Sequence, residues 1–166
     1  MIVEKCKIDD FEAIKRNISH AILFMRSYGN LEQWNNLDSL LKDIEYDIYL
    51  GRYYKIVEGD EIVGSFMFSK DLEPTYEVIE GKWNNDSPYG VIHRICSSGD
   101  KKGILKVALD YCFELIDNIR IDTHKDNLPM RHLLEKYKFH ECGIITLKNK
   151  QKRIAYQSER NIYYGK

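Results

Sequence analysis

The sequence predicts an α/β (α+β) fold in which one mixed, mostly antiparallel sheet also holds a parallel pair of strands. Two hairpin-like segments, Tyr53–Phe68 and Glu141–Tyr163, predict the antiparallel part. Between them, Tyr89–Phe139 alternates strand, helix, strand and helix, which is typical of parallel strands joined by a crossover. The 166 residues suit one domain, which we expect to span residues 1–166.

Composition excludes several classes of protein. Lys and Arg number 25 against 26 Asp and Glu, so no overall field favours nucleic acid or an anionic membrane as a partner. The four cysteines are far apart and form no CxxC pair, so we expect no disulfide framework or metal site and a reduced, cytoplasmic setting. The longest early apolar run, Ala21–Met25, is too short for a signal peptide or a membrane span.

The N-terminal third predicts a short strand and two helices. Ile2–Cys6 is the candidate strand, and a helix is expected from Asp9 to the stop at Tyr28–Asn30, because its apolar residues recur every three or four positions. A second helix is expected over Leu37–Leu50, with Gly51 beyond its end. Glu58-Gly59-Asp60 then predicts the turn between the strands of the first hairpin.

The middle and end of the chain alternate helices and strands. In the mixed segment Asp71–Ser87 we expect one short helical turn, at Tyr76–Ile79. The expected elements after it are a strand, a helix, a strand, a helix and two strands, at Tyr89–Cys96, Gly103–Asn118, Ile119–Thr123, Asn127–Phe139, Glu141–Leu147 and Ile154–Tyr163. The basic loop Lys148–Arg153 is interpreted as a solvated hairpin tip rather than a binding patch.

Two segments of this central run are candidates for ligand binding. Lys101, Lys102 and Gly103 open a helix, and free N–H groups and the helix dipole bind anions at such a start. On these residues alone, an ordinary loop whose glycine makes the turn explains the pattern better. Asn127 precedes Leu128 and Pro129, the pattern of a helix N-cap, and capping does not exclude ligand contact.

Two motifs lie on the fourth and fifth predicted strands: His93-Arg94-Ile95 on the fourth, and Arg120-Ile121-Asp122-Thr123-His124 on the fifth, followed by Asp126-Asn127. With these motifs the chain resembles the Gcn5-related N-acetyltransferase family, above all its small bacterial members. The similarity extends from Val3 to about Tyr163. It implies a fold with about four helices, in which parallel strands 4 and 5 splay apart and acetyl-CoA lies in the gap.

The resemblance also implies roles for individual residues toward acetyl-CoA, a co-substrate, with no metal. Backbone groups of Ile95 and Ser97 would pair with the pantetheine arm, and an amide near Ile95 or Cys96 would polarise the thioester carbonyl. Asn127 would contact the thioester end. The pyrophosphate would be held by amides of Lys101, Lys102, Gly103, Ile104 and Leu105.

The chain departs from the family pattern at two places. Of the usual pyrophosphate signature, Gln/Arg-x-x-Gly-x-Gly/Ala, only the last glycine is kept, as Gly103, and Lys101 takes the place of the earlier one. A tyrosine that acts as general acid in many members is replaced by Leu134, which has no proton to donate. Lysine would pair with phosphate as a point charge.

The expected reaction is direct attack of a neutral amine on the acetyl thioester, which needs a base. His93 and Glu80 are the catalytic candidates, weighed beside Asp122 and His124, and a structural role explains His93 somewhat better than a catalytic one. We expect Trp34, Tyr76, Tyr89 and His124 to bind the acceptor, although core packing explains such aromatic residues at even odds.

The expected function is N-acetylation of the primary amine of a small acceptor. A non-catalytic acyl-CoA-binding module and a protein or peptide N-acetyltransferase are the alternatives. Tyrosines near the C-terminus are a faint indication of a homodimer.

Overall fold

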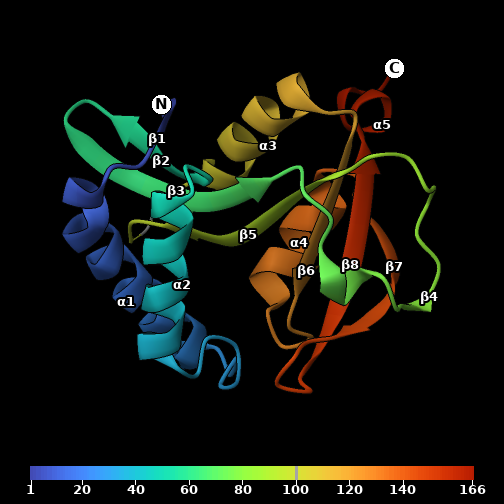
Figure 1. Cartoon of the computed structure of the whole chain (residues 1–166), viewed down its shortest axis with the longest axis horizontal. Coiled ribbons are helices and arrows are strands. Elements are labelled where there is room, and N and C mark those ends of the chain that lie inside the picture. The colour runs from blue at the N-terminus through green and yellow to red at the C-terminus, as the bar shows by residue number, and fades with distance from the viewer. Residues whose placement is uncertain (100) are drawn as a thin grey trace. The chain divides into compact units, whose positions relative to one another are not determined.

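The computed structural model describes residues 1–99 and 101–166 and contains a mixed sheet with helices packed on it (Figure 1). The order of the eight strands is β1-β2-β3-β5-β6-β8-β7-β4. The strands are β1 Ile2–Lys5, β2 Tyr53–Glu58, β3 Glu61–Ser69, β4 Glu80–Gly81, β5 Gly90–Ser97, β6 Asn118–Thr123, β7 His140–Thr146 and β8 Lys152–Glu159. The helices of these described residues are α1 Phe11–Ser27, α2 Leu37–Tyr49, α3 Ile104–Leu115, α4 Leu128–Lys136 and α5 Arg160–Tyr164, with short 3-10 turns η1 Ile8–Asp10 and η2 Pro74–Tyr76.

The predicted fold class is confirmed. β5 and β6 run parallel, whereas β1–β2, β2–β3, β6–β8, β7–β8 and β4–β7 are antiparallel. The parallel ladder is short and pairs Gly90 with Ile119 and Val91 with Arg120. No helix of the described residues has the length and apolar character needed to cross a membrane.

The described residues group into two compact units that alternate along the chain. The first unit contains Met1–Phe68 and His93–Tyr111, and the second contains Ser69–Ile92 and Cys112–Lys166. The chain therefore passes from one unit to the other three times, at the end of β3, within β5 and within α3. The expectation of one domain over residues 1–166 stays a prediction.

In the first unit, helices pack on both faces of the strands. Tyr53 of β2 points into a core that α1 and α2 build, whereas the next residue, Tyr54, points to the opposite face and contacts Tyr111 of α3 with ring centroids 5.4 Å apart. Figure 1 shows α1 and α2 on one side of β1–β3 and α3 on the other. The first core contains Cys6, Ile14, Ile18, Leu40, Ile44, Ile48, Tyr53, Met67 and Cys96.

Arg94 lies within β5 but has a positive φ, whereas the residues of a regular strand have a negative φ. Its φ is 53°, which costs an L-residue about 1–2 kcal/mol. Its guanidinium forms an ion pair with Asp47 of α2, whose side chain is only 1% exposed. Asp47 also accepts a hydrogen bond of 2.7 Å from Nε of Arg52. Because two guanidinium groups neutralise the buried carboxylate, this pairing holds Arg94 in its strained conformation.

In the second unit, β6 pairs with β8 along its whole length, from Asn118 opposite Glu159 to Thr123 opposite Ile154. One face carries an aromatic cluster in which Arg120 is held between two rings, 4.1 Å from the centroid of Trp83 and 4.0 Å from that of Tyr89. The second core on this face contains Tyr76, Val91, Ile145 and Ala155.

Several element boundaries differ from those predicted, among them the ends of β8 and α3 and the position of the turn before β4. β8 ends at Glu159 and α5 follows, so the strand predicted for Ile154–Tyr163 is wrong after Glu159. The reason is that β6 begins at Asn118, opposite Glu159, and the N–H of Arg160 turns to the carbonyl of Asp117 at 2.7 Å. For the same reason α3 ends at Leu115 rather than Asn118. The turn predicted at Tyr76–Ile79 lies earlier, at Pro74–Tyr76.

Two glycines let β4 and β7 approach each other. A Cβ on Gly81 would lie 2.2 Å from the carbonyl oxygen of Cys142, and one on Gly143 would lie 2.2 Å from that of Glu80. Both glycines have positive φ, 137° and 150°. Backbone atoms occupy the space in each case, so no rotamer change relieves the clash.

Gly143→Ala should therefore lower the free energy of unfolding by about 3 kcal/mol or more, measured by urea denaturation. Gly59→Ala is the matched control, because Gly59 also has positive φ but nothing lies within 4 Å of its added Cβ. The control should lose only about 1 kcal/mol. Equal losses in the two variants would show that φ alone, and not the contact with β4, requires a glycine at Gly143.

Asp47→Asn should lower the free energy of unfolding by about 3 kcal/mol, because it leaves Arg94 and Arg52 without their shared counter-charge. Asp43→Asn, on the exposed face of the same helix, is the control and should change stability by less than about 0.5 kcal/mol. If both variants unfold at the same urea concentration as the parent, the ion pair does not stabilise β5.

Candidate active site

The end of β5 carries the backbone groups that the resemblance assigns to the cofactor. Cys96 is buried, with its Sγ 3.5 Å from Oγ of Ser65, and burial raises the pKa of the thiol to about 11. A cofactor would therefore meet only backbone atoms of Cys96. The N–H of Ser98 donates to the carbonyl of Val63 at 2.8 Å, which attaches the start of the following loop to β3.

The strained residue Arg94 directly precedes Ile95, where the polarising amide is expected. A residue at φ 53° breaks the regular alternation of a strand, so the peptide groups after it change direction. Strained backbone of this kind clusters at functional sites. The assignment of Ile95, Cys96 and Ser97 to acetyl-CoA stays a prediction, and no sequence pattern indicated the strained backbone of Arg94.

The start of α3 has the geometry of an anion site. Val107 makes the first intrahelical bond, from its N–H to the carbonyl of Gly103 at 3.1 Å, so the amides before it point out of the helix end. Gly103 has φ 85°, and a Cβ built there would meet only the end of Met1, at 3.8 Å. Gly64 of β3 allows the close approach, because its Cβ would lie 2.8 Å from Ile104.

Two lysines flank this helix start in different ways. Lys101 forms an ion pair with Glu58, at the end of β2, and its N–H donates to the carbonyl of Ser98 at 3.1 Å. Lys102 is exposed. The backbone and the lysine charges fit a diphosphate group, and Glu58 would compete with such a group for Lys101.

In the second unit, the segment after β6 contains the other predicted cofactor contact. Oδ1 of Asn127 accepts a hydrogen bond from the N–H of Met130 at 3.3 Å, so the predicted N-cap of α4 is confirmed. Leu134 of the same helix is fully buried, so this position supplies packing and no acid. The contact of Asn127 with acetyl-CoA stays a prediction.

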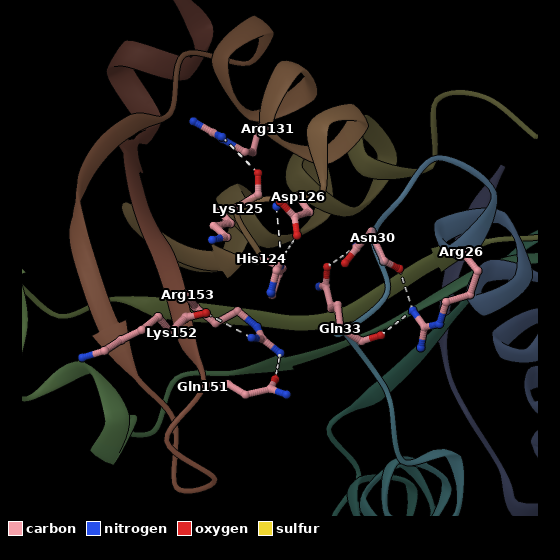
Figure 2. Close-up of polar contacts among 10 residues, drawn as sticks. All are labelled: Arg26, Asn30, Gln33, His124, Lys125, Asp126, Arg131, Gln151, Lys152 and Arg153. Carbon is pink, nitrogen blue, oxygen red and sulfur yellow. Dashed lines mark hydrogen bonds and ion pairs between the residues drawn. The ribbon is translucent and has the colours of Figure 1, made fainter.

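The candidate bases lie in different surroundings. His93 is half-buried in the first-unit part of β5. Glu80 belongs to the second unit, and its side chain is 67% exposed and 3.3 Å from Nζ of Lys152. Asp122 accepts a hydrogen bond of 2.7 Å from the hydroxyl of Tyr76. His124 is 8% exposed, and its Nδ1 accepts from the N–H of Asp126 at 3.1 Å (Figure 2).

The aromatic residues expected to line an acceptor site make many contacts within their own units. Tyr76 is 2% exposed and packs on Trp83, while the hydroxyl of Tyr89 accepts from the N–H of Glu73 at 3.1 Å. In the first unit, Trp34 is half-buried, and its carbonyl accepts from Arg26 at 3.1 Å. These contacts favour the packing alternative for Tyr76, and the acceptor role of the set stays a prediction.

Arg153 is the polar residue that the sequence analysis missed. The interpretation of Lys148–Arg153 as a solvated tip is wrong for Arg153, which lies in β8 and is only 6% exposed. Its place in the alternation with Ala155 and Gln157, both buried, was the available signal. Among the described residues, no group of three or more histidine, cysteine or carboxylate side chains is arranged to hold a metal ion.

Comparison with known proteins gives a consistent result for the fold. No family model and no curated protein matches the chain. Among solved structures, a GNAT-family acetyltransferase from Streptococcus agalactiae has a TM-score of 0.85 and 27% identity, over 95% of this chain and 94% of that one. A putative acetyltransferase from Staphylococcus aureus has a TM-score of 0.72 and 23% identity, over 96% and 99% of the two chains.

A more distant neighbour is described with a coenzyme A derivative. It is RimJ from Mycobacterium smegmatis, in complex with CoA-disulfide, with a TM-score of 0.58 and 15% identity over 98% of this chain and 88% of that one. The name of the Streptococcus agalactiae protein supports acetyl transfer as the general chemistry. The resemblance inferred from the sequence is therefore confirmed, and the chain has the Gcn5-related N-acetyltransferase fold along about 95% of its length.

Proposed function

We propose that the chain transfers the acetyl group of acetyl-CoA to the primary amine of a small acceptor, by direct attack of the amine. The observation that carries this proposal is the glycine-opened start of α3, flanked by Lys101 and Lys102, directly after a strand that Arg94 distorts. The first four amides of a helix have no intrahelical partner, and together with two ammonium groups they suit a diphosphate.

In this proposal, acetyl-CoA supplies an activated thioester and the chain positions it. Amides from Lys102 to Leu105 hold the diphosphate, whereas the predicted amide of Lys101 already donates to the carbonyl of Ser98. Backbone groups of Ile95 and Ser97 align the pantetheine arm, and Asn127 contacts the thioester end. An amide near Ile95 or Cys96 stabilises negative charge on the carbonyl oxygen. Holding amine and thioester together provides much of the acceleration.

The amine must lose a proton, and the departing sulfur has no evident acid. His93 and Glu80 are the proposed bases, with Asp122 and His124 as the alternatives weighed beside them. Leu134 donates no proton, so the sulfur would leave as a thiolate, which is a tolerable leaving group near neutral pH. The buried Leu134 is also the observation that favours the second candidate, a non-catalytic acyl-CoA-binding module.

Thiol release distinguishes these functions. With a panel of small primary amines, acetyl-CoA should release coenzyme A at a rate that depends on amine concentration, measured with a thiol reagent. Peptides and protein N-termini form the second arm of the panel. If acetyl-CoA raises the melting temperature but neither arm yields thiol, the binding module is correct; if peptides alone react, the acceptor is a protein.

The diphosphate site is tested by Lys101→Ala combined with Lys102→Ala. This variant should weaken acetyl-CoA binding about tenfold in calorimetry, because two charge-assisted contacts are lost. Its activity with S-acetyl-N-acetylcysteamine, a donor without the nucleotide, should be unchanged. Glu58→Gln is the control: it removes the carboxylate that pairs with Lys101, so it should bind acetyl-CoA as tightly as the parent or more tightly.

Unchanged acetyl-CoA affinity in the double lysine variant would show that the diphosphate does not bind at the start of α3. The expected weakening should also shrink as salt is raised, because both lysines are partly or fully solvent-exposed. A loss of activity with both donors would instead indicate a general disturbance of the fold.

The thioester contact is tested by Asn127→Ala, with Asn127→Asp as the control. Alanine removes both the N-cap and the proposed contact, whereas aspartate keeps the cap of α4 but has no amide N–H to donate. Alanine should lower the free energy of unfolding by about 1 kcal/mol and aspartate should not. Both should lower kcat/KM for acetyl-CoA; full activity in the aspartate variant would leave Asn127 as a cap only.

A further inference from the structure

Arg153 is a buried cation without a carboxylate partner in the part of the chain that the structure describes. The residue is 6% exposed, and its two hydrogen bonds go to neutral oxygens. Nη1 donates to the carbonyl of Lys152 at 3.1 Å and Nη2 donates to Oε1 of Gln151 at 3.0 Å (Figure 2). A buried charge is costly unless it is paired, so a guanidinium in this position calls for an anion.

Two other arginines of the second unit, Arg120 and Arg160, are paired in a different way, whereas the half-buried Arg131 also donates to neutral oxygens, those of Tyr156 and Lys125. Arg120 lies between the rings of Trp83 and Tyr89 and donates to Gln157 and to the carbonyl of Asn85. Arg160 forms an ion pair with Asp117 at 3.2 Å. Arg153 has neither an aromatic sandwich nor an ion pair, and its two hydrogen bonds use two of the five N–H groups of a guanidinium.

The position of Arg153 in the sheet places it beside the predicted acceptor end of the site. Thr123, the last residue of β6, is opposite Ile154, so Arg153 and His124 are next to each other where the two strands end. Figure 2 shows their side chains extending toward the same space. Asn127, the proposed thioester contact, follows three residues after His124. Nδ1 of His124 accepts a hydrogen bond from the N–H of Asp126 and lies 3.6 Å from Oδ2 of that residue.

The carboxylate of Asp122 restricts the charge that a ligand of Arg153 can carry. Asp122 is opposite Ala155, and because side chains alternate along a strand, Asp122 and Arg153 project from the same face. Burial lowers the pKa of Arg153, and the charge of Asp122 partly offsets that effect. A cation and an anion on one face complement a zwitterion, whereas Asp122 would repel a doubly charged phosphate.

We propose that Arg153 binds the carboxylate of the acceptor, with His124 beside it, so that the acceptor is an amine that also carries a carboxylate, such as an amino acid. This inference rests on the proposed acetyl transfer and narrows its substrate class. Bidentate pairing with a planar carboxylate is the interaction for which a guanidinium is suited. Asp122, on the same face, complements the charge of the amino group.

The test uses matched sets of acceptors and products with the full chain. Each set contains three acceptors: an amino acid, its amide and the corresponding amine without the carboxyl group. The N-acetyl forms of the amino acid and of its amide are the two product probes. The acceptors are assayed for thiol release, and the products are assayed by calorimetry in the presence of coenzyme A. The variants are Arg153→Gln, Arg153→Met and the control Lys152→Gln, whose side chain points away and contacts Glu80 and Thr146.

The parent should prefer the free acid over the amide by at least about tenfold in at least one set, in kcat/KM and in product binding. Arg153→Gln and Arg153→Met should abolish this preference and leave acetyl-CoA affinity unchanged, while Lys152→Gln should keep it. Melting temperatures identify any variant that fails to fold; the methionine variant, which leaves no polar group buried, keeps the test decisive if the glutamine variant unfolds.

Two outcomes would overturn the carboxylate site. One is a parent that treats acid and amide alike in every set. The other is a preference for the acid that persists without Arg153. Failure of the proposed acetyl transfer has a different signature: N-acetyl amino acids would still bind through Arg153, but no acceptor would release thiol.

Discussion

The buried carboxylate of Asp47 is the constraint on which the first unit depends. It lies on α2, yet it neutralises Arg94 in β5 and Arg52 just before β2, so one side chain connects a helix to the segments on which it packs. The strained backbone at Arg94 exists because this pairing is available inside the protein. The peptide groups after Arg94 are those that the proposed function uses, so their direction is set by a charge outside the strand.

The helices and hairpins could be predicted from the sequence because their signals are local. Apolar spacing located α1 and α2 to within two residues, and Asn127 with Pro129 marked the start of α4. The φ of Arg94 could not be predicted, because it depends on a partner 47 residues away. The end of β8 was missed because only the position of β6 determines where its pairing stops.

Residue type alone was a poor guide to the candidate site. Tyr76, Trp83 and Tyr89 have the composition of a ligand pocket, but in the structure they pack on one another and around Arg120. Arg153 had the appearance of one more charge in a basic loop, yet it is buried. In both cases the decisive information is which face of a strand a residue occupies, and a pattern of alternating residues indicates this only once the strand is placed.

The glycine contact between β4 and β7 has a consequence for the edge of the sheet. β4 is the last strand in the order and only two residues long, and its backbone lies against that of Gly143 because neither glycine carries a side chain. An exposed strand edge is a template on which a second chain adds and aggregation begins. Because β4 pairs with the middle of β7, a strand from another chain would find little continuous backbone with which to pair. This short edge strand therefore hinders fibre growth from this side of the sheet.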